Sequence, residues 1–436
     1  MSKILPLESA ATSHTGGELL ERSLKRAIWR LGPLLMLMYV VSFLDRANVS
    51  FAKQALAATE GISERAYALG AGLFFIGYST FGFPSNLILH RVGARIWIAF
   101  LMVTWGLVSM ATMFVSGSTS FYILRLLLGA TEAGFFPGII FYLTLWFPKR
   151  VRGQMLGLFY LGVPLALIVG GPLSGYLLDL APPGGVQGWQ VMFLVEGALA
   201  AVLGVFAFWL LDDRPADAKW LPEDEKRALL AALTQEEDQR RVAGPTKLLP
   251  MLRDGRVFGF LAVYALIQMS TYGAVFYLPA EISALLRKPE GFEVGAVSAI
   301  PWLCALAATY LLPRLGDVRQ CHRLLAILTL LIAGFASFAF PVCGPAWGLA
   351  MLSIAVSGFI AVQPLFWTFP TAYFADRAAA GGIALIGVGN LGGFLAPNVK
   401  VWADQHFHSP SAGLYVLAGL TVLNAGFLAR QTRRRG

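Results

Sequence analysis

The chain has 436 residues, of which 57% are hydrophobic and only 14% are charged. This composition, with a mean hydropathy of +0.65, excludes an ordinary soluble protein of this length and indicates a polytopic membrane protein. The net charge of +9 does not indicate a nucleic-acid partner, because the basic residues are spread over connecting segments rather than gathered in one patch.

We predict an all-α membrane protein with twelve transmembrane helices, because a helix needs about 20 apolar residues to cross the hydrocarbon core. Six predicted spans come before residue 212 and six after residue 256, so they form two six-helix bundles. In chain order the spans are 30–52, 66–88, 95–116, 120–145, 153–178, 189–211, 257–284, 293–313, 323–341, 346–371, 379–402 and 411–430.

The spans divide the chain into five parts. These are an N-terminal segment (1–29), a six-helix bundle (30–211), a linker (212–256), a second six-helix bundle (257–430) and a basic tail (431–436). Residues 1–29 contain no apolar stretch typical of a removable signal peptide. In the linker, Pro222 followed by acidic residues indicates a helix start. That segment is either an amphipathic helix on the membrane or the bundle, or a solvated linker.

Basic residues predict the orientation of the chain. The connections 116–119, 179–188 and 341–346 contain no Lys or Arg, and five basic residues elsewhere on that side are exceptions. By the positive-inside rule, both termini and the linker face the cytoplasm. The basic residues that follow spans 4, 8 and 12 are Lys149, Arg150, Arg152, Arg314, Arg319, Arg323, Arg433, Arg434 and Arg435.

The two halves resemble each other weakly at corresponding spans. Span 4 ends with LTLWFPKR (143–150) and span 10 with LFWTFPTAYFADR (365–377), while span 5 contains GGPLSG and span 11 contains GGFLAPN. Such a duplication is typical of carriers in which one half rocks against the other. Glycines four residues apart, such as Gly171 and Gly175, allow the close helix packing of such an interface.

Four charged residues lie inside predicted spans: Asp45 and Arg46 in span 1, and Arg125 and Glu132 in span 4. A charge near the bilayer centre costs about 2.5–3.5 kcal/mol on insertion scales, and such residues usually face a cavity and handle ions or substrate. Arg125 and Glu132, seven residues apart, share nearly the same helix face. Asp45 and Arg46 point about 100° apart, so they do not both face one partner.

Ionised, these four charges sum to zero. One proton on Asp45 or Glu132 leaves a positive charge that accepts a carboxylate, for which the planar arginine fork is well suited. Proton uptake and anion binding then favour each other, as a proton-coupled carrier of an organic anion requires. The alternative is a pair of static salt bridges between spans 1 and 4, a role that rarely offsets the cost of intramembrane charges.

Other polar and aromatic residues are candidates to complete a pocket. Taken singly, each is explained as simply by packing or by a helix–helix hydrogen bond, and Asn390 in its glycine-rich stretch is the best of them. Asp179 and Glu196 lie nearer predicted helix ends and are interpreted as interfacial. The pocket candidates are Tyr39, Phe43, Tyr78, Gln268, Tyr272, Gln363, Trp367 and Asn390.

Neither metal nor enzyme chemistry is indicated by the sequence. The cysteines Cys304, Cys321 and Cys343 are isolated, and His406 and His408 lack the further ligands that a metal site needs. No nucleophile–base pair falls in one predicted cavity. We therefore expect no enzyme and no cofactor, with a proton gradient as the energy source.

The motifs FLDRANVSFA (43–52), FYILRLLLGATEAGFFPGIIFYLTLWFP (121–148), GWQVMFLVEG (188–197) and GGIALIGVGNLGGFLAP (381–397) stand out. The most specific feature is the Arg-x6-Glu-x4-Pro pattern of Arg125, Glu132 and Pro137 together with Asp45 and Arg46. These motifs resemble the major facilitator superfamily, and within it the anion:cation symporter family of organic-acid permeases. The resemblance covers about residues 27–430.

This resemblance implies an alternating-access carrier of a bacterial inner membrane that imports small organic anions with protons. Family substrates include sugar acids, tartrate, phthalate, nicotinate-like acids and hydroxyphenylacetate-like acids. By position, Arg46 and Arg125 bind the anion, and Asp45 and Glu132 couple protons. The pocket is then lined by Tyr78 and Asn390, with Phe43, Gln363 and Trp367 as further candidates.

Some positions depart from the family pattern. Phe43 stands where sugar-acid carriers often have tyrosine, which favours a less hydroxylated, aromatic acid. His90 stands near the usual aspartate of the gating motif between spans 2 and 3. Asp317 lies in an altered turn between spans 8 and 9, and Gly387 and Val388 replace a common Asn-Ser pair. These changes affect the inner gate and the pocket of the second half.

The sequence thus predicts a monomeric secondary active transporter that imports a small organic carboxylate, with the substrate, protons and the lipid bilayer as partners. A first alternative is a proton-coupled exporter or antiporter of amphipathic compounds, which needs a wide apolar cavity and depends less on paired arginines. A second is a non-transporting membrane sensor. A sensor usually carries a larger soluble domain than the linker of about 45 residues.

Overall fold

The computed structural model describes residues 7–243, 254–373 and 385–432, and every regular element in this part of the chain is a helix. Apolar sequences form helices in a bilayer because each backbone polar group is then satisfied within its own segment. The first half comprises α1 (Leu7–Ala47), η1 (Asn48–Ser50), α2 (Lys53–Glu60), α3 (Glu64–Val92), α4 (Ala94–Ala111), η2 (Thr112–Phe114), α5 (Gly117–Glu132), α6 (Phe135–Trp146), α7 (Lys149–Tyr160), α8 (Gly162–Leu178) and α9 (Gly188–Leu210).

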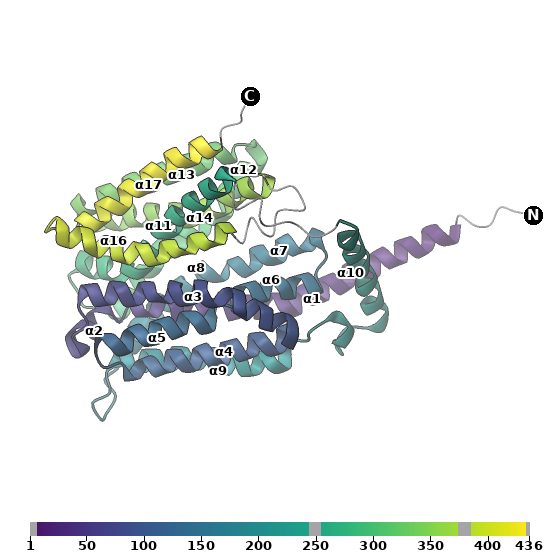
Figure 1. The fold of residues 1–436 in the computed structure, drawn as a ribbon, viewed down its shortest axis with the longest axis horizontal. Coiled ribbons are helices and arrows are strands. Elements are labelled where there is room, and N and C mark those ends of the chain that lie inside the picture. Colours follow the sequence, from purple (N-terminus) through teal and green to yellow (C-terminus); the bar gives the residue numbers. More distant parts are fainter. Residues whose placement is uncertain (1–6, 244–253, 374–384, 433–436) are drawn as a thin grey trace, which may run out of the picture.

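The linker and the second half follow the same helical pattern. Figure 1 shows two groups of helices, coloured purple to blue and green to yellow, that lie side by side. The linker contains η3 (Pro215–Asp217) and α10 (Glu223–Ala243). The second half comprises α11 (Gly255–Leu286), α12 (Phe292–Arg319), α13 (His322–Ala339), η5 (Phe340–Val342), α14 (Pro345–Tyr373), η6 (Val388–Leu391), α16 (Gly392–His406) and α17 (Ala412–Gln431).

Eleven helical stretches of the described residues are long and apolar enough to cross a membrane. They correspond to predicted spans 1–10 and 12. The predicted eleventh span begins outside the described residues and continues as η6 and α16. The helix that contains the first predicted span extends further toward the N-terminus than the span itself, because α1 begins at Leu7. Hydropathy does not reveal this extension, since its Glu, Arg and Lys residues are charged, although they favour helix.

The two halves make their closest backbone contact between α8 and α12. A Cβ atom on Gly171 would lie 2.5 Å from the carbonyl oxygen of Gly295, and one on Gly175 would lie 2.4 Å from that of Gly291. Both separations are shorter than a real Cβ contact, so glycine is required at this interface. The predicted packing glycines therefore hold the halves together.

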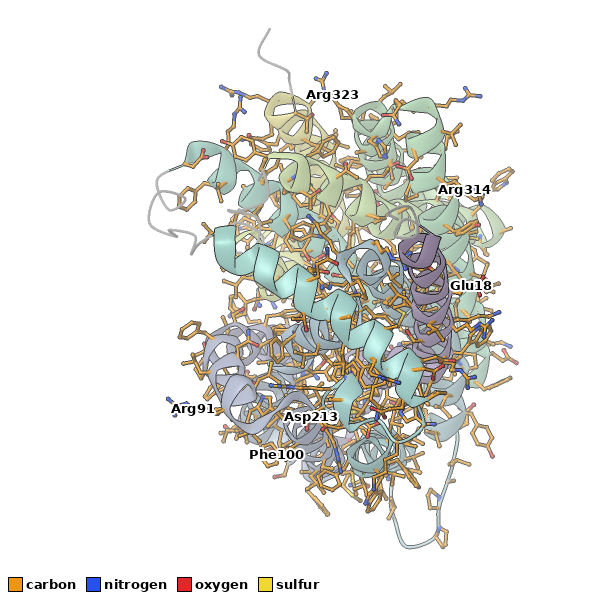
Figure 2. The ribbon with its side chains drawn as sticks, turned by 90° about the vertical axis from the view of Figure 1, so that its right-hand side faces the viewer. Glu18, Arg91, Phe100, Asp213, Arg314 and Arg323 are labelled. Atoms are coloured by element: carbon orange, nitrogen blue, oxygen red, sulfur yellow. The ribbon has the colours of Figure 1, made fainter. Side chains whose placement is uncertain are left out.

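One face of the bundle carries α10 and the described ends of the chain, and we call it the linker face; the opposite side is the far face. There α10 packs on α1, with Nε of Arg26 3.0 Å from Oε2 of Glu225. The linker segment is thus a helix on the bundle. Figure 2 looks onto this face, where Arg314 and Arg323 also lie. The side chain of His90 and residues 433–436 lie outside the described part of the chain.

Candidate functional site: a buried arginine pair

A buried ion pair joins the first and fourth membrane spans. Arg46, near the end of α1, is 6% exposed, and its Nη2 donates to Oε1 of the fully buried Glu132 at the end of α5. Ser42, one turn before Arg46, donates its hydroxyl to the same oxygen. The other oxygen of Glu132 has no hydrogen-bond partner among the described residues.

A break in the fourth span positions Glu132. Helix α5 ends at this residue and α6 begins at Phe135. At the break, Gly134 approaches α3 so closely that a Cβ atom would lie 1.7 Å from Oγ of Ser85. A larger residue would therefore push α3 away from the site, which explains glycine directly beside the buried carboxyl.

Arg125 lies on the same face of α5 as Glu132, as the seven-residue spacing predicts, and is 1% exposed. Its Cζ lies 5.3 Å from the ring centroid of Phe74, and Cζ of Arg46 lies 5.0 Å from the same centroid. The two guanidinium groups therefore flank one aromatic ring. Nε and Nη2 of Arg125 have no acceptor among the described residues. Burying a hydrogen-bond donor without an acceptor costs free energy, so an acceptor that reached Arg125 would be bound favourably.

Aromatic side chains surround Arg46. Its Cζ lies 4.8 Å from the ring centroid of Phe43 and 5.2 Å from that of Tyr78, and cation–π contacts of this kind contribute about 2 kcal/mol when desolvated. Nη1 of Arg46 donates to the hydroxyl of Tyr272 on α11 at 3.2 Å. Since α11 belongs to the second half, Arg46 links the two halves at the site.

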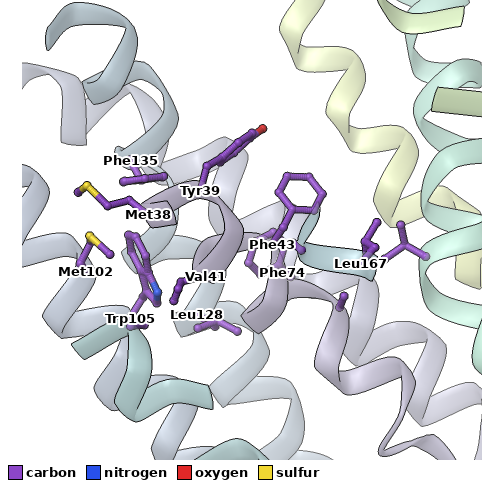
Figure 3. Packing of buried hydrophobic residues seen from close by; sticks show 14 of the residues in the cluster. Met38, Tyr39, Val41, Phe43, Phe74, Met102, Trp105, Leu128, Phe135 and Leu167 are labelled. Carbon is purple, nitrogen blue, oxygen red and sulfur yellow. The ribbon is translucent and has the colours of Figure 1, made fainter. Parts of the chain in front are cut away.

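Asp45 faces away from the arginine pair, although it precedes Arg46 in the chain. Its Oδ1 accepts from Oγ of Ser109 at 2.6 Å, and its Oδ2 accepts from Nε1 of Trp105 at 3.2 Å. Both donors lie on α4. Figure 3 shows Trp105 and Phe43 on opposite sides of α1. Only Arg46 of the neighbouring pair thus reaches the site by direct contact.

A neutral polar group occupies the second half. Nε2 of Gln268 on α11 donates to Oδ1 of Asn390 in η6 at 2.7 Å, and the hydroxyl of Tyr264 lies 3.5 Å from the same oxygen. The ring of Trp367 on α14 lies 5.0 Å from that of Tyr264, centroid to centroid. The structure therefore brings Gln268, Asn390 and Trp367 together around Tyr264, a residue that the sequence did not single out.

Two pocket candidates have other partners. Nε2 of Gln363 donates to Oγ1 of Thr271 at 3.3 Å, which links α14 to α11 within the second half. The ring of Tyr39 stacks on that of Phe159 with centroids 4.1 Å apart. Each of these contacts is a packing contact between helices, which is the alternative that the sequence left open for both residues.

The interpretation of Glu196 as interfacial is wrong. This residue is fully buried and accepts a hydrogen bond from Oγ of Ser174 at 2.7 Å. Helix α9 begins at Gly188, so Glu196 lies more than two turns inside it. Asp179, by contrast, follows the end of α8 and accepts from the backbone N–H of Phe292 at 2.8 Å.

Hydrogen bonds between the halves close the far face. The backbone N–H of Gln54 donates to Oε2 of Glu290 at 3.2 Å, and its side chain donates to Oγ of Ser283 at 3.0 Å. Burial raises the pKa of Glu290 to about 8, although the Gln54 N–H and the charge of Lys53 oppose the shift. Glu290 lies in the connection between α11 and α12, so its protonation is tied to closure of this face.

The sequence matches the family model described as Major Facilitator Superfamily over residues 35–397. The chain belongs to the major facilitator superfamily. It is therefore a membrane transporter and not an enzyme, and its two helical halves are those of the major facilitator fold.

Relatives of this transporter carry the names of membrane transporters. Inner membrane transport protein RhmT of Escherichia coli (strain K12) is 43% identical over 408 residues, which cover 93% of this chain and 94% of the relative. A putative tartrate transporter of Agrobacterium vitis is 41% identical, covering 93% and 90%. The inward open structure of the xylose transporter XylE from E. coli superposes with a TM-score of 0.74 at 16% identity, covering 94% of this chain and 97% of that one.

Proposed function

We propose that this transporter imports a small organic carboxylate together with protons, across a bacterial inner membrane and with its termini in the cytoplasm. The observation that carries the proposal is the charge imbalance around Phe74. Two guanidinium groups flank that ring, and Glu132 balances one of them. Because Asp45 turns to α4, the arginine pair keeps a positive charge that a substrate carboxylate can neutralise.

The chemistry of arginine favours a carboxylate ligand over a neutral one. The planar guanidinium presents paired N–H donors that match the two oxygens of a carboxylate, and it stays charged when buried. Arg125 holds two such donor atoms without an acceptor among the described residues. In a low-dielectric site an opposite charge is strongly favoured, so the anion is both attracted and oriented there.

Glu132 connects the anion to the proton. Its carboxylate holds Arg46 in the structure, so it competes with a substrate carboxylate for the same guanidinium. A proton on Glu132 removes the negative charge and frees Arg46 for the substrate. Since Tyr272 of the second half also contacts Arg46, movement of the halves changes the surroundings of Arg46, and with them the affinities on which coupling depends.

The aromatic surroundings indicate the substrate class. Phe43, Phe74 and Tyr78 place three rings against Arg46, which suits a small acid with an apolar or aromatic body. The amides of Gln268 and Asn390 supply neutral hydrogen-bonding groups in the second half. A relative is named as a tartrate transporter, so the substrate panel should include tartrate beside aromatic monocarboxylates.

Purified protein in liposomes tests the proposal. A thermal-shift screen against carboxylic acids first identifies a ligand, and uptake of that ligand is then measured with and without an acidic exterior. We expect acid outside to accelerate uptake and to concentrate the anion, and Arg125→Ala to abolish both. Efflux accelerated by acid outside would establish the exporter instead, and binding without any flux would establish the sensor.

A further inference from the structure

A second group of buried polar side chains lies in the first half, away from the arginine pair and toward the far face. Glu196 of α9 accepts a hydrogen bond at Oε1 from Oγ of Ser174 on α8, at 2.7 Å. Its Oε2 has no partner among the described residues. Asn48 of η1 is 1% exposed, and its amide faces the Glu196 carboxyl closely enough to stabilise the ionised form, although among the described residues neither Oδ1 nor Nδ2 makes a hydrogen bond of full geometry.

A small cavity joins this group to the interface between the halves. It has a volume of about 10 Å³ and is lined by Asn48 and Ser174 from the first half and by Ser298 and Trp302 of α12 from the second. This is close to the smallest space that holds one water molecule, and a water needs two to four polar partners. The Asn48 amide and the hydroxyls of Ser174 and Ser298 provide them.

Access to this cavity depends on the relative position of the halves. Its wall contains Gly171 of α8, whose backbone meets that of Gly295 on α12 at the closest contact between the halves. Opening of the far face separates α8 from α12 and exposes the cavity to outside water. Closing of the far face seals it again, with the carboxyl of Glu196 behind Ser174.

The charges around Glu196 make its ionised form costly when the cavity is sealed. Asp45 of α1 lies within electrostatic reach, and the partners that α4 presents to Asp45 are the neutral Ser109 and Trp105. From α8 the contact is the hydroxyl of Ser174, and from η1 it is the neutral amide of Asn48; both favour the ionised form, but neither supplies a charge. Among the described residues no Lys or Arg forms an ion pair with Glu196, and a buried carboxylate without a cation is strongly disfavoured.

Building on the proposed function, we propose that Glu196 is a third carboxyl that takes up a proton from outside, and that α8 and α12 close the far face only after it has done so. In the open state a hydronium ion gives its proton through the cavity water to the Glu196 carboxylate, leaving a carboxylic acid and water. Reopening reverses the step. Glu196 touches no substrate, so it is a positioning residue that makes closure depend on external pH.

Cysteine labelling from outside measures this closure without substrate. Ser298→Cys is placed as the single cysteine, and Glu290→Gln removes a second carboxyl of the far face, one whose pKa burial raises to about 8. Labelling by an impermeant maleimide is followed against external pH. The pH dependence of thiol chemistry itself is taken from a matched protein whose single cysteine is Cys343, which lies outside the cavity lining.

With Glu196 present, the corrected labelling of Ser298→Cys should rise by roughly tenfold from acidic to alkaline external pH, the change that one pH unit of linkage produces. Glu196→Gln mimics the protonated carboxyl and should remove the rise. Ser174→Ala keeps the carboxyl but deletes the donor to its charged form, so the midpoint should move to higher pH. A pH profile that is unchanged in Glu196→Gln, or in Ser174→Ala if the first variant does not fold, overturns the proposal.

The labelling also separates this inference from the transport function. If carboxylate uptake fails to depend on a proton gradient while labelling keeps its dependence on Glu196, the symport proposal falls and the closing role of Glu196 stands. If uptake is proton-driven but the labelling profile ignores Glu196, symport stands and the closing role falls.

Discussion

The two halves of this transporter share a fold but differ in the chemistry that they bring to the centre. The first half buries charge, in the guanidinium groups of Arg46 and Arg125 and the carboxyl of Glu132. The second half presents neutral groups, chiefly the hydrogen-bonded amides of Gln268 and Asn390. Two bundles that occupy equivalent places in the fold have therefore taken up different tasks.

Electrostatics explains this division. The electrostatic energy of a buried charged group changes greatly when a proton or an anion binds nearby. An amide carries no charge and does not titrate, so its energy changes little with pH. We therefore expect coupling to depend on the first half. We expect the amides of the second half, together with the aromatic rings of both halves, to discriminate among substrates by shape and hydrogen bonding. Variants in the two halves should accordingly fail in different ways.

Loss of a central arginine should have the largest effect. Arg125→Ala removes one of the two guanidinium groups at Phe74, and truncating a buried charged partner costs about 2–5 kcal/mol. We expect binding of the carboxylate identified in the thermal-shift screen to weaken by at least roughly 30-fold. Isothermal titration of the purified protein measures the loss.

The matched control for this arginine is Arg314→Ala, which removes an arginine from the linker face, where its guanidinium hydrogen-bonds to Tyr310. That variant should bind the acid as the unchanged protein does. Equal affinities of Arg125→Ala and the unchanged protein would show that the substrate binds elsewhere, and the division between the halves would lose its basis.

Neutralising Glu132 should separate binding from coupling. Glu132→Gln resembles the protonated carboxyl, so Arg46 stays available to the anion. We expect counterflow exchange of labelled acid to continue, while the accumulation ratio driven by an acidic exterior falls to about one because no proton is carried. Glu281→Gln, which changes a carboxyl of α11 in the second half, is the control that should keep accumulation. Undiminished accumulation in Glu132→Gln removes this residue from the coupling scheme.

The central charges could be predicted from the sequence because charged residues inside apolar spans are conspicuous. The sequence could not predict which way each charged side chain points. The 100° between Asp45 and Arg46 predicts that they separate, but the choice of which faces the site rests on the Ser109 and Trp105 side chains of another helix. Glu196 was interpreted as interfacial although the predicted start of its span, residue 189, lies one residue from the observed start of α9 at Gly188. The position of a residue along a span does not show which side chains of other helices bury it, such as Ser174 of α8.

Neutral groups of the second half were harder to recognise than charges. An amide in a membrane helix serves packing as readily as binding, so the sequence could not separate Asn390, which meets Gln268, from Gln363, which meets Thr271. The sequence did not single out Tyr264, because nothing distinguishes it from the other tyrosines that lie in apolar spans. Its role follows only from the packing of α11, η6 and α14.

Substitution in the second half should alter selectivity and leave coupling intact. Asn390→Ala deletes the acceptor of Gln268, and loss of one buried neutral hydrogen bond costs about 1 kcal/mol. We expect affinities across a panel of hydroxylated and aromatic acids to change by roughly fivefold, in different directions, with an accumulation ratio close to that of the unchanged protein. Competition uptake assays provide the ranking. Gln363→Ala is the control, and an identical change there would make packing the explanation for both.

The last prediction concerns the far face, where Glu290 joins the two halves. Its pKa of about 8 in the closed state exceeds the usual value of a carboxyl in water, about 4.3, because closure buries it. The closed state therefore binds the proton more tightly. Its advantage is complete below about pH 4.3 and is lost as the pH rises toward about 8. The Gln54 N–H, which stabilises the ionised carboxylate in the closed state, is already part of this shift, so the ratio of closed to open should fall by at most roughly 5,000-fold over this range.

Distances between spin labels on the two halves at the far face, recorded against pH in the Glu196→Gln background, report this equilibrium. Glu290→Gln should remain closed over the whole range. Glu293→Gln, a neighbour whose carboxyl pairs with Lys288 of the same half, should keep the pH dependence because it makes no contact across the interface. If Glu290→Gln and Glu293→Gln gave the same profile, surface charge in general would account for the closure. The link between the halves would then rest on contacts other than Glu290, such as the hydrogen bond from the Phe292 N–H to Asp179, and Glu290 would have no part in the response to external pH.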